Sequence, residues 1–312
     1  MKSFLVLLSL SENFKTSILI FLLSPLVLYS CSGKSQIQNP KFQIRDDAGV
    51  EITFDSIPKR IISLAPNITE TLFAIDADPQ VVGVTDLCDF PPEVNNKTKT
   101  GSYISPNYEV MVSLNPDLII MNVENTSNPT YQALKNMNMK VYVSNAKDIE
   151  GIYKMISDFG KMTGKKSEAD SLDKYLHTEE MKYATKKNYR AKSLILISVN
   201  PLMTTNGKTF INDIIEMAPL MNMYGGEALD YPNVSYEDVI KKDPDIIVFP
   251  TDTNDVAKSV KFTDEIKRQL INTSAVKNNK IILVDENIMY RPGPRVFEAV
   301  RIVNDKYMNE TK

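Results

Sequence analysis

Two stretches of the chain repeat one pattern of hydrophobic and polar positions. The segments YEVMVSLNPDLIIM (residues 108–121) and YEDVIKKDPDIIVF (residues 236–249) align without a gap and share Tyr, Glu, Pro, Asp and Ile. Each begins with a short helix-like stretch, turns at a Pro-Asp pair and ends in an uninterrupted apolar run. Such a run is typical of a strand in a parallel sheet that is covered on both faces. The pattern therefore predicts the same helix–turn–strand unit twice.

A second pair of segments extends the repeat upstream. RIISLAPN (residues 60–67) and LILISVNP (residues 194–201) are apolar strands that end in Asn and Pro, and the helix-like stretches TETLFAI and FINDIIEMA follow them. Strand and helix thus alternate in the same order twice, which indicates an α/β fold of two Rossmann-like lobes with central parallel sheets. We expect an N-terminal lobe at residues 42–147 and a C-terminal lobe at residues 191–312.

The segment between the lobes, residues 148–190, has a helical pattern and no Pro. Ile149, Ile152, Ile156 and Phe159 recur at helical spacing and predict a first helix. A second helix is expected over about residues 167–188, and its ~22 residues would extend about 33 Å. This length suffices to cross from one lobe to the next, so we expect a single long backbone helix to join the lobes and to permit only a small hinge motion.

The N-terminal segment has the features of an export signal. Residues 17–30 carry no charge, follow Lys15 and precede Cys31, and the run is shorter than the ~20 apolar residues that span a bilayer. The sequence LYSC resembles a bacterial lipobox, in which the cysteine is acylated and becomes the mature N-terminus. We expect residues 1–30 to be a lipoprotein signal peptide, Cys31 to be lipidated and residues 31–41 to be a tether. An uncleaved anchor is the alternative, and both place the folded part outside the cytoplasm.

Composition excludes several classes of function. The chain has 36 basic and 39 acidic residues, for a net charge of −3, so it has no basic surplus for nucleic acid. Its single histidine, His177, falls in the connector and argues against a serine hydrolase and against sites that need several imidazoles. Neither GxGxxG nor GxxxxGK[ST] occurs, so nucleotide phosphates have no candidate loop. We expect no metal, no cofactor and no nucleic-acid partner.

Two glutamates occupy equivalent places in the repeated segments. Glu109 and Glu237 fall in the first turn of the two predicted helices, where the helix dipole favours a carboxylate. A carboxylate pair could serve a secreted carbohydrate-active enzyme, but that chemistry needs a separation of about 5–10 Å and twin lobes would hold these two far apart. Exposed acids on two lobes suit the docking of two basic partners better.

Four segments together resemble one known family. They are RIISLAPNITETLFAIDADPQVVGVTDLCDFPPEV, GSYISPNYEVMVSLNPDLII, VSYEDVIKKDPDIIVF and IMYRPGPRVFEAVRIV, and the likeness covers nearly all of residues 42–305. The chain resembles the periplasmic binding proteins that deliver cobalamin or ferric siderophores to ABC importers. The resemblance implies a monomeric binding protein and not an enzyme, with its ligand between the lobes. It also implies that Glu109 and Glu237 form salt bridges with arginines of the permease.

The resemblance also implies a set of ligand contacts. Cobalamin-binding members line the site with aromatic residues, and Tyr103 and Tyr231 fall at matching positions, although Leu87 stands where an aromatic is more usual. An anionic ferric siderophore would instead need arginines, for which Arg291 and Arg295 are the candidates, with a structural helix-start role as the alternative for Arg295. Haem with a tyrosine ligand is a third option. The expected cargo is a cobalamin-type corrinoid, and the expected contacts are Pro66, Asn67, Leu87, Tyr103, Tyr231, Tyr290, Arg291 and Arg295.

Overall fold

The computed structural model describes residues 41–102, 105–183 and 190–310. The predicted signal peptide, Cys31, all but the last residue of the predicted tether, and Tyr103 lie outside the described residues. Within the described ranges, no helix is both long and apolar enough to cross a membrane.

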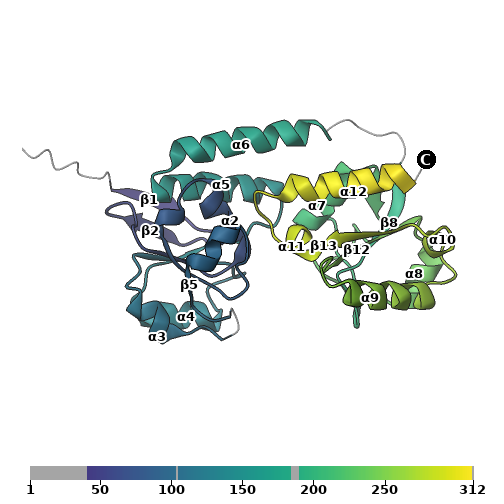
Figure 1. Ribbon diagram of the computed structural model, residues 1–312, viewed down its shortest axis with the longest axis horizontal. Helices are drawn as coiled ribbons and strands as arrows, with labels where there is room; N and C mark the ends of the chain where they lie inside the picture. Colours follow the sequence, from purple (N-terminus) through teal and green to yellow (C-terminus); the bar gives the residue numbers. More distant parts are fainter. Residues whose placement is uncertain (1–40, 103–104, 184–189, 311–312) are drawn as a thin grey trace, which may run out of the picture. The chain divides into compact units, whose positions relative to one another are not determined.

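Two parallel sheets form the centres of the two lobes (Figure 1). The N-lobe sheet has the strand order β5-β4-β3-β6-β7, and the C-lobe sheet has the order β11-β8-β12-β13. The N-lobe strands are β3 (Ile61–Ser63), β4 (Val81–Val84), β5 (Thr98–Lys99), β6 (Leu118–Met121) and β7 (Val141–Val143), and the C-lobe strands are β8 (Ala191–Ile195), β11 (Leu220–Asn222), β12 (Ile246–Thr251) and β13 (Ile281–Asp285). All strand pairs within these sheets are parallel, which confirms the predicted fold class.

Two antiparallel hairpins and a set of helices complete the described chain. The hairpins are β1 (Phe42–Arg45) with β2 (Glu51–Phe54), and β9 (Ser198–Val199) with β10 (Leu202–Met203). The helices are α2 (Pro66–Ala74), η2 (Asp78–Gln80), η3 (Pro92–Asn96), α3 (Tyr108–Ser113), α4 (Pro129–Asn136), α5 (Ile149–Thr163), α6 (Lys166–Met181), α7 (Phe210–Met217), α8 (Tyr236–Lys242), α9 (Val256–Gln269), α10 (Ser274–Lys277), α11 (Glu286–Met289) and α12 (Val296–Glu310).

Both faces of each sheet are covered, as the apolar runs predict. In β12, Ile246 and Val248 belong to the core cluster that contains side chains of α7 and α12. Ile247 and Phe249 point the other way, into the cluster that contains side chains of α8, α9 and α10. Alternate residues of a strand face opposite sides of the sheet, so a strand that is buried on both sides needs a continuous apolar run.

The repeated Pro-Asp turns have the same structural role in both lobes. The carboxylate of Asp117, just before β6, accepts a hydrogen bond from the N–H of Arg60 at 3.0 Å. The carboxylate of Asp245, just before β12, accepts one from the N–H of Lys192 at 2.8 Å. Each aspartate therefore ties the start of its own strand to the start of the neighbouring strand, β3 or β8. The internal similarity of the sequence thus corresponds to equivalent contacts.

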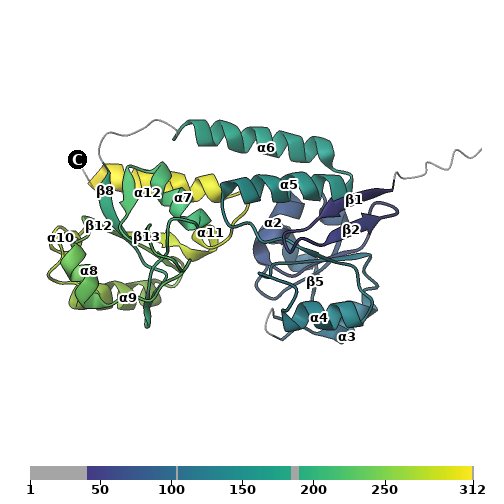
Figure 2. The ribbon, with the colours of Figure 1, turned by 180° about the vertical axis from the view of Figure 1, so that it is seen from behind.

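The connector contains two helices, α5 and α6, which lie side by side (Figures 1 and 2). Gly164 ends α5 in a left-handed conformation, with φ of 73°, and only Lys165 separates it from α6. A Cβ atom at Gly160 would lie 2.4 Å from the Cβ of Ala169, so close packing of the pair requires glycine there. Helix α6 ends at Met181, before the expected end near residue 188. The long connecting helix that the sequence predicts over about residues 167–188 is α6, the second member of this pair.

Helix α5 is attached to both lobes. It packs on α2 of the N-lobe, and the N–H of Ile149 in its first turn donates a hydrogen bond to the Asp213 carboxylate of α7 at 3.1 Å. Burial raises the pKa of Asp213 to about 6, and the neighbouring charges of Asp148 and Glu216 act in the same direction. The folded pKa therefore exceeds the ordinary value of 3.8, so the native state holds this proton more tightly than the unfolded chain.

This carboxyl should make the free energy of unfolding fall as pH rises from about 4 to about 6. Asp213→Asn keeps an oxygen acceptor and removes the titration, so between pH 4.5 and pH 7.5 the variant should lose about 2 kcal/mol less stability than the wild type. Urea unfolding at the two pH values measures the difference. Asp264→Asn on α9 is the control, because Asp264 is exposed and is not among the groups that shift the pKa of Asp213. Equal pH slopes for wild type and Asp213→Asn would contradict the assignment.

Candidate functional site

The residues expected to contact ligand follow the carboxyl ends of parallel strands in both lobes. In open α/β sheets, this is the edge beyond which ligands bind. Pro66 and Asn67 follow β3, and Leu87 follows β4 in the N-lobe; Tyr231 follows β11, and Tyr290, Arg291 and Arg295 follow β13 in the C-lobe. The topology therefore assigns the expected contacts to the same kind of strand end in each sheet.

Tyr231 is an accessible aromatic side chain of this set. It is 43% exposed, on the loop that follows β11. Burial of its hydroxyl raises its pKa, and the charges of Asp230 and Glu124 raise it further. Glu124 follows β6, so the phenol of Tyr231 in the C-lobe lies within electrostatic reach of an N-lobe loop.

Tyr290 lies close to Tyr231 and is less accessible. Its hydroxyl donates a hydrogen bond to the carbonyl of Ile197 at 3.0 Å. Burial raises the pKa of Tyr290 most, and the charge of Glu286 and the neighbouring phenol of Tyr231 raise it further. Both phenols therefore stay protonated at neutral pH and offer aromatic faces and neutral hydroxyls.

Two leucines extend the apolar character of these loops. Leu87 is 62% exposed and Leu229 is 70% exposed. Contiguous apolar patches mark binding surfaces, and these two side chains add apolar area to the strand-end loops of both lobes. Leu229 was not among the expected contacts. Its position in LDYPN, two residues before the expected contact Tyr231, could have indicated that it belongs to the same loop.

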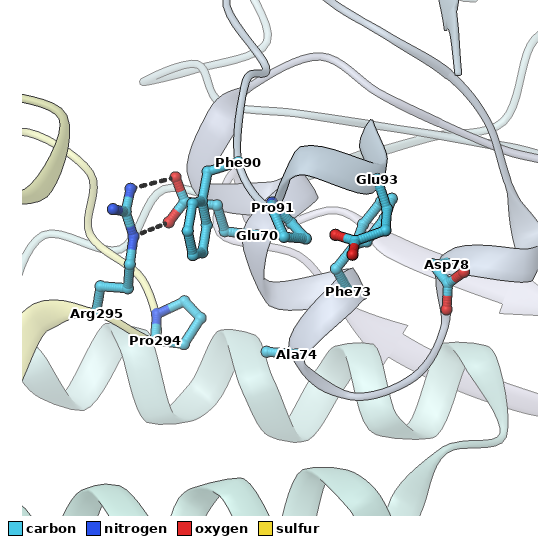
Figure 3. A pocket seen from close by; sticks show the side chains of 9 residues that line it. All are labelled: Glu70, Phe73, Ala74, Asp78, Phe90, Pro91, Glu93, Pro294 and Arg295. Atoms are coloured by element: carbon cyan, nitrogen blue, oxygen red, sulfur yellow. Dashed lines mark hydrogen bonds and ion pairs between the residues drawn. The ribbon is translucent and has the colours of Figure 1, made fainter. Parts of the chain in front are cut away.

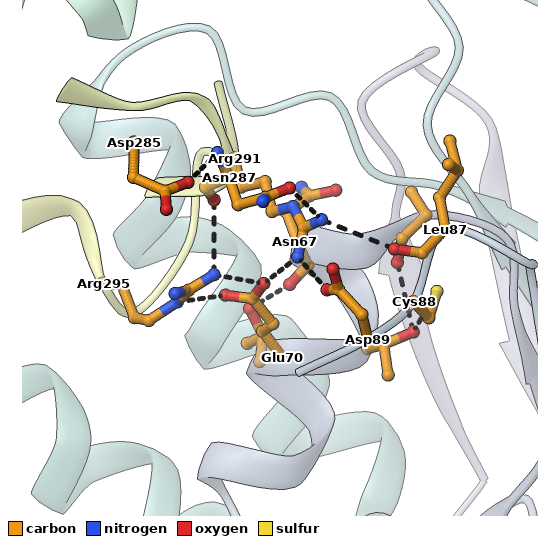
Figure 4. A network of polar contacts seen from close by, with 12 residues as sticks. Asn67, Glu70, Leu87, Cys88, Asp89, Asp285, Asn287, Arg291 and Arg295 are labelled. Carbon is orange, nitrogen blue, oxygen red and sulfur yellow. Dashed lines mark hydrogen bonds and ion pairs between the residues drawn. The ribbon is translucent and has the colours of Figure 1, made fainter. Parts of the chain in front are cut away.

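Arg291 and Arg295 are engaged by carboxylates of the N-lobe (Figure 4). Arg295 donates from Nε and Nη2 to the two oxygens of Glu70 at 2.8 and 2.7 Å, and Arg291 donates from Nη1 to Glu70 at 2.9 Å. Arg291 also donates from Nη1 to Asp89 at 2.6 Å. The side chains of Arg291 and Arg295 are only 12% and 19% exposed. In this structure both guanidiniums thus pair with carboxylates of the protein, while the expected contact of Arg291 and Arg295 with a ligand stays a prediction.

Glu70 is a residue of this network that the sequence analysis missed. Its side chain is 2% exposed and accepts three hydrogen bonds from the two arginines. Its place in the largely apolar stretch TETLFAI could have indicated a buried acid. A buried carboxylate needs a cationic partner. Arg295 immediately precedes α12, in keeping with the helix-start alternative.

Asn67 also joins the two lobes. It is 4% exposed, and its side-chain amide donates a hydrogen bond to the carbonyl of Pro292 at 3.2 Å. Its amide is therefore buried against the C-lobe in this structure, and the expected ligand contact by Asn67 stays a prediction. Pro66, at the first position of α2, is partly exposed.

A hollow of about 410 Å³ lies beside the Glu70–Arg295 ion pair (Figure 3). Its apolar walls include Phe73, Phe90 and Pro294, and the guanidinium of Arg295 lies 4.2 Å from the centre of the Phe90 ring. The full lining is Glu70, Phe73, Ala74, Asp78, Phe90, Pro91, Glu93, Pro294 and Arg295. Of the expected ligand contacts, only Arg295 lines this hollow. The hollow is part of the contact between the lobes, because Phe73 and Phe90 belong to the N-lobe and Pro294 to the C-lobe.

Glu109 and Glu237 are exposed at the second positions of α3 and α8. The two helices begin alike: Asn107 accepts a hydrogen bond from the N–H of Val110 at 3.1 Å, and Ser235 accepts one from the N–H of Asp238 at 3.1 Å. Among the residues that the structure describes, neither glutamate has an ion pair or a side-chain hydrogen bond. Both carboxylates are therefore available to an external cation.

Comparison with known proteins identifies the family. Residues 61–288 match the family model described as periplasmic binding protein. The chain belongs to this family. It is 28% identical, over 86% of each chain, to an uncharacterized ABC transporter substrate-binding lipoprotein of Bacillus subtilis. It is 25% identical to the vitamin B12-binding protein of Pectobacterium atrosepticum, over 79% of this chain and 87% of that protein.

Solved structures of periplasmic binding proteins have the same fold. The vitamin B12 binding protein of Vibrio cholerae matches with a TM-score of 0.69 and 24% identity, over 82% of this chain and 99% of that one. A periplasmic haem binding protein of Pseudomonas aeruginosa matches with a TM-score of 0.71 and 19% identity, over 80% and 93% of the two chains. Proteins with different ligands therefore share this fold, so the cargo has to be inferred from the site.

Proposed function

We propose that this protein is the substrate-binding component of an ABC importer, and that its cargo is a cobalamin-type corrinoid. It acts as a monomeric binding protein and not as an enzyme. Lipidated Cys31 holds it at the periplasmic or extracytoplasmic face of a membrane. The observation that carries the choice of cargo is the set of exposed apolar and aromatic side chains on the strand-end loops, together with the pairing of both arginines to carboxylates of the protein.

The rival cargoes need groups that the described site does not offer. An anionic siderophore needs guanidiniums without a partner, and those of Arg291 and Arg295 bind carboxylates of the protein. Haem ligation by tyrosine requires loss of the phenol proton, and burial and nearby negative charges, which raise the pKa of Tyr231 and Tyr290, make that loss harder than at an ordinary tyrosine. A corrinoid requires apolar and aromatic contact with a few polar anchors, which Leu87, Tyr231 and Tyr290 can supply. We retain Tyr103 and Pro66 as further contacts in this proposal.

Delivery to the permease is assigned to Glu109 and Glu237. Each is exposed in the first turn of its helix, and the two occupy equivalent positions in the two lobes. Two carboxylates on two lobes can fix both the position and the orientation of the protein on a surface with two basic sites.

Calorimetric titration of residues 32–312 tests the cargo. The chain has no Trp, so calorimetry is preferable to fluorescence quenching. We expect one cyanocobalamin to bind per chain, with micromolar affinity or better, and no heat from a panel of ferric siderophores or from haem. Heat from a ferric complex and none from cyanocobalamin would reject the cargo while leaving the family unaffected.

Tyr231→Ala should weaken cobalamin binding about fivefold or more, because stacking of an aromatic ring on a ligand contributes about 1 kcal/mol. Tyr231→Phe keeps the ring and should retain most of the affinity. Tyr175→Ala is the matched control, since Tyr175 is a 57% exposed tyrosine on α6. Unchanged affinity in Tyr231→Ala would make Tyr231 a packing residue of its loop.

A further inference from the structure

We propose that Glu70, Asp89, Arg291 and Arg295 form a latch that holds the N-lobe binding loop, residues 85–91, on the C-lobe and fixes the two lobes at one separation. Arg291 and Arg295 are thereby positioning residues for the cargo and not contacts to it. The proposal rests on the proposed function only in treating the loop that carries Leu87 as part of the binding site.

The arginines are fixed on the C-lobe side by α11. Arg291 donates from Nη2 to the side-chain oxygen of Asn287 at 2.5 Å, and Arg295 donates from Nη2 to the Asn287 carbonyl at 3.2 Å. Both guanidiniums therefore extend from a fixed base in the C-lobe toward the N-lobe (Figure 4).

The N-lobe groups that meet them come from two separate elements. Glu70 belongs to α2, whereas Asp89 and the carbonyl of Leu87 belong to the binding loop. Arg291 contacts all three, with its Nη2 to the Leu87 carbonyl at 3.4 Å. Arg295 adds the stacking contact with Phe90. One pair of arginines thus holds both the N-lobe helix and the loop that presents Leu87.

Burial and charge make this contact costly to open. The cluster pairs two guanidiniums with two carboxylates, and the Glu70 side chain is almost fully buried. Separation of the lobes would break the three hydrogen bonds to Glu70 and the one to Asp89 together, whereas a single surface ion pair contributes little. Although burial acts to raise the pKa of Asp89, the hydrogen bond and charge of Arg291 lower it below its ordinary value, which indicates a strong contact to the loop.

The apolar core connects the lobes independently of the latch. One continuous cluster of buried side chains includes Leu72 of α2, Ile152 and Phe159 of α5, and Phe297 and Val300 of α12. The lobes are therefore joined both by this core, through the connector helices, and by the latch. Two attachments at different places restrict rotation of one lobe against the other more than one attachment does.

Distances between spin labels on the two lobes test the latch without any cargo. We would label Val112→Cys on α3 and Lys241→Cys on α8 in residues 32–312, which lack Cys31, with the buried Cys88 replaced by Ser. The protein with an intact latch should give one narrow distance distribution that does not shift when cyanocobalamin is added. Glu70→Gln should broaden or shift that distribution.

Asp158→Asn is the matched control for Glu70→Gln. Asp158 is also a buried carboxylate, 8% exposed, but its ion pairs with Lys154 and Lys161 lie within α5. Its substitution should leave the distance distribution unchanged. If Glu70→Gln does not fold, Arg291→Lys replaces it, because a lysine keeps the charge but cannot serve all four acceptors of Arg291. An unchanged distribution in the folded latch variant would overturn the latch.

Asp89→Asn tests only the contact between Arg291 and the binding loop. Asp89 is 58% exposed, so this change should leave the distance distribution unchanged but weaken cargo binding about two- to fivefold. Unchanged affinity would remove the positioning role of Arg291. A broadened distribution in Glu70→Gln together with no binding of cyanocobalamin by the wild type would support the latch and reject the proposed cargo, so the two failures are distinguishable.

Discussion

Import is expected to be abolished when Glu109→Lys and Glu237→Lys are combined, while cargo affinity stays at the wild-type value. Both side chains are exposed, and neither has an ion pair within the described part of the chain. Lysines at these places would face the basic residues of the permease, and like charges across an interface cost several kcal/mol. Uptake of labelled cobalamin by cells that carry the cognate permease measures import, and calorimetry measures affinity.

Glu150→Lys combined with Glu168→Lys is the matched control for this experiment. Glu150 and Glu168 also lie in the first turns of helices, α5 and α6, so the control has the same change in net charge and the same unfavourable helix-dipole term. Glu168 also has an ion pair with Lys165 at 3.6 Å, so the control disrupts the protein at least as much as the tested change. Import should continue in this variant. Loss of cargo affinity in the Glu109 and Glu237 variant would place these residues in the binding site, and continued import would reject the docking role.

Glu70→Ala is expected to lower the free energy of unfolding by about 3–5 kcal/mol. Removal of this carboxylate leaves two guanidiniums, each less than one-fifth exposed, without their shared partner. An unpaired buried charge costs much more than the net stability that the intact pair contributes. Urea unfolding at neutral pH measures the change.

Asp89→Ala is the comparison for this loss of stability. Its carboxylate also pairs with Arg291, at 2.6 Å, but it is 58% exposed. Solvent screens a pair of that kind, so its removal should cost about 1 kcal/mol or less. If Glu70→Ala is no more destabilising than Asp89→Ala, then the network is not a buried charge cluster in solution.

Much of the fold follows from local patterns in the sequence. The apolar runs after the repeated turns became strands that are buried on both faces, because strand geometry sends alternate residues to opposite sides. The repeated aspartates, Asp117 and Asp245, make equivalent contacts in the two lobes. The first turns of α3 and α8 also follow from local rules, because Asn107 and Ser235 cap them and exposed acids suit the next positions. The docking role of Glu109 and Glu237 stays a prediction.

The site could be predicted only in part. Leu87, Tyr231 and Tyr290 follow the ends of parallel strands, as the order of elements indicates. Arg291 and Arg295 were expected to contact a ligand because of the family resemblance and the preference of guanidinium for anionic oxygens, and nothing close to them in the chain signals a buried acid partner. Their partner Glu70 lies 221 and 225 residues away, so the pairing has no local signature.

The sequence by itself determined the α/β class, the twin lobes and the exposed acids at the starts of α3 and α8, because these depend on side-chain spacing over a few residues. Only the tertiary structure decided which charges are available. It paired Arg291 and Arg295 with Glu70, buried Asn67 against Pro292, and left Leu229 exposed. The physical reason is that charge pairing and burial depend on residues that meet only when the chain has folded.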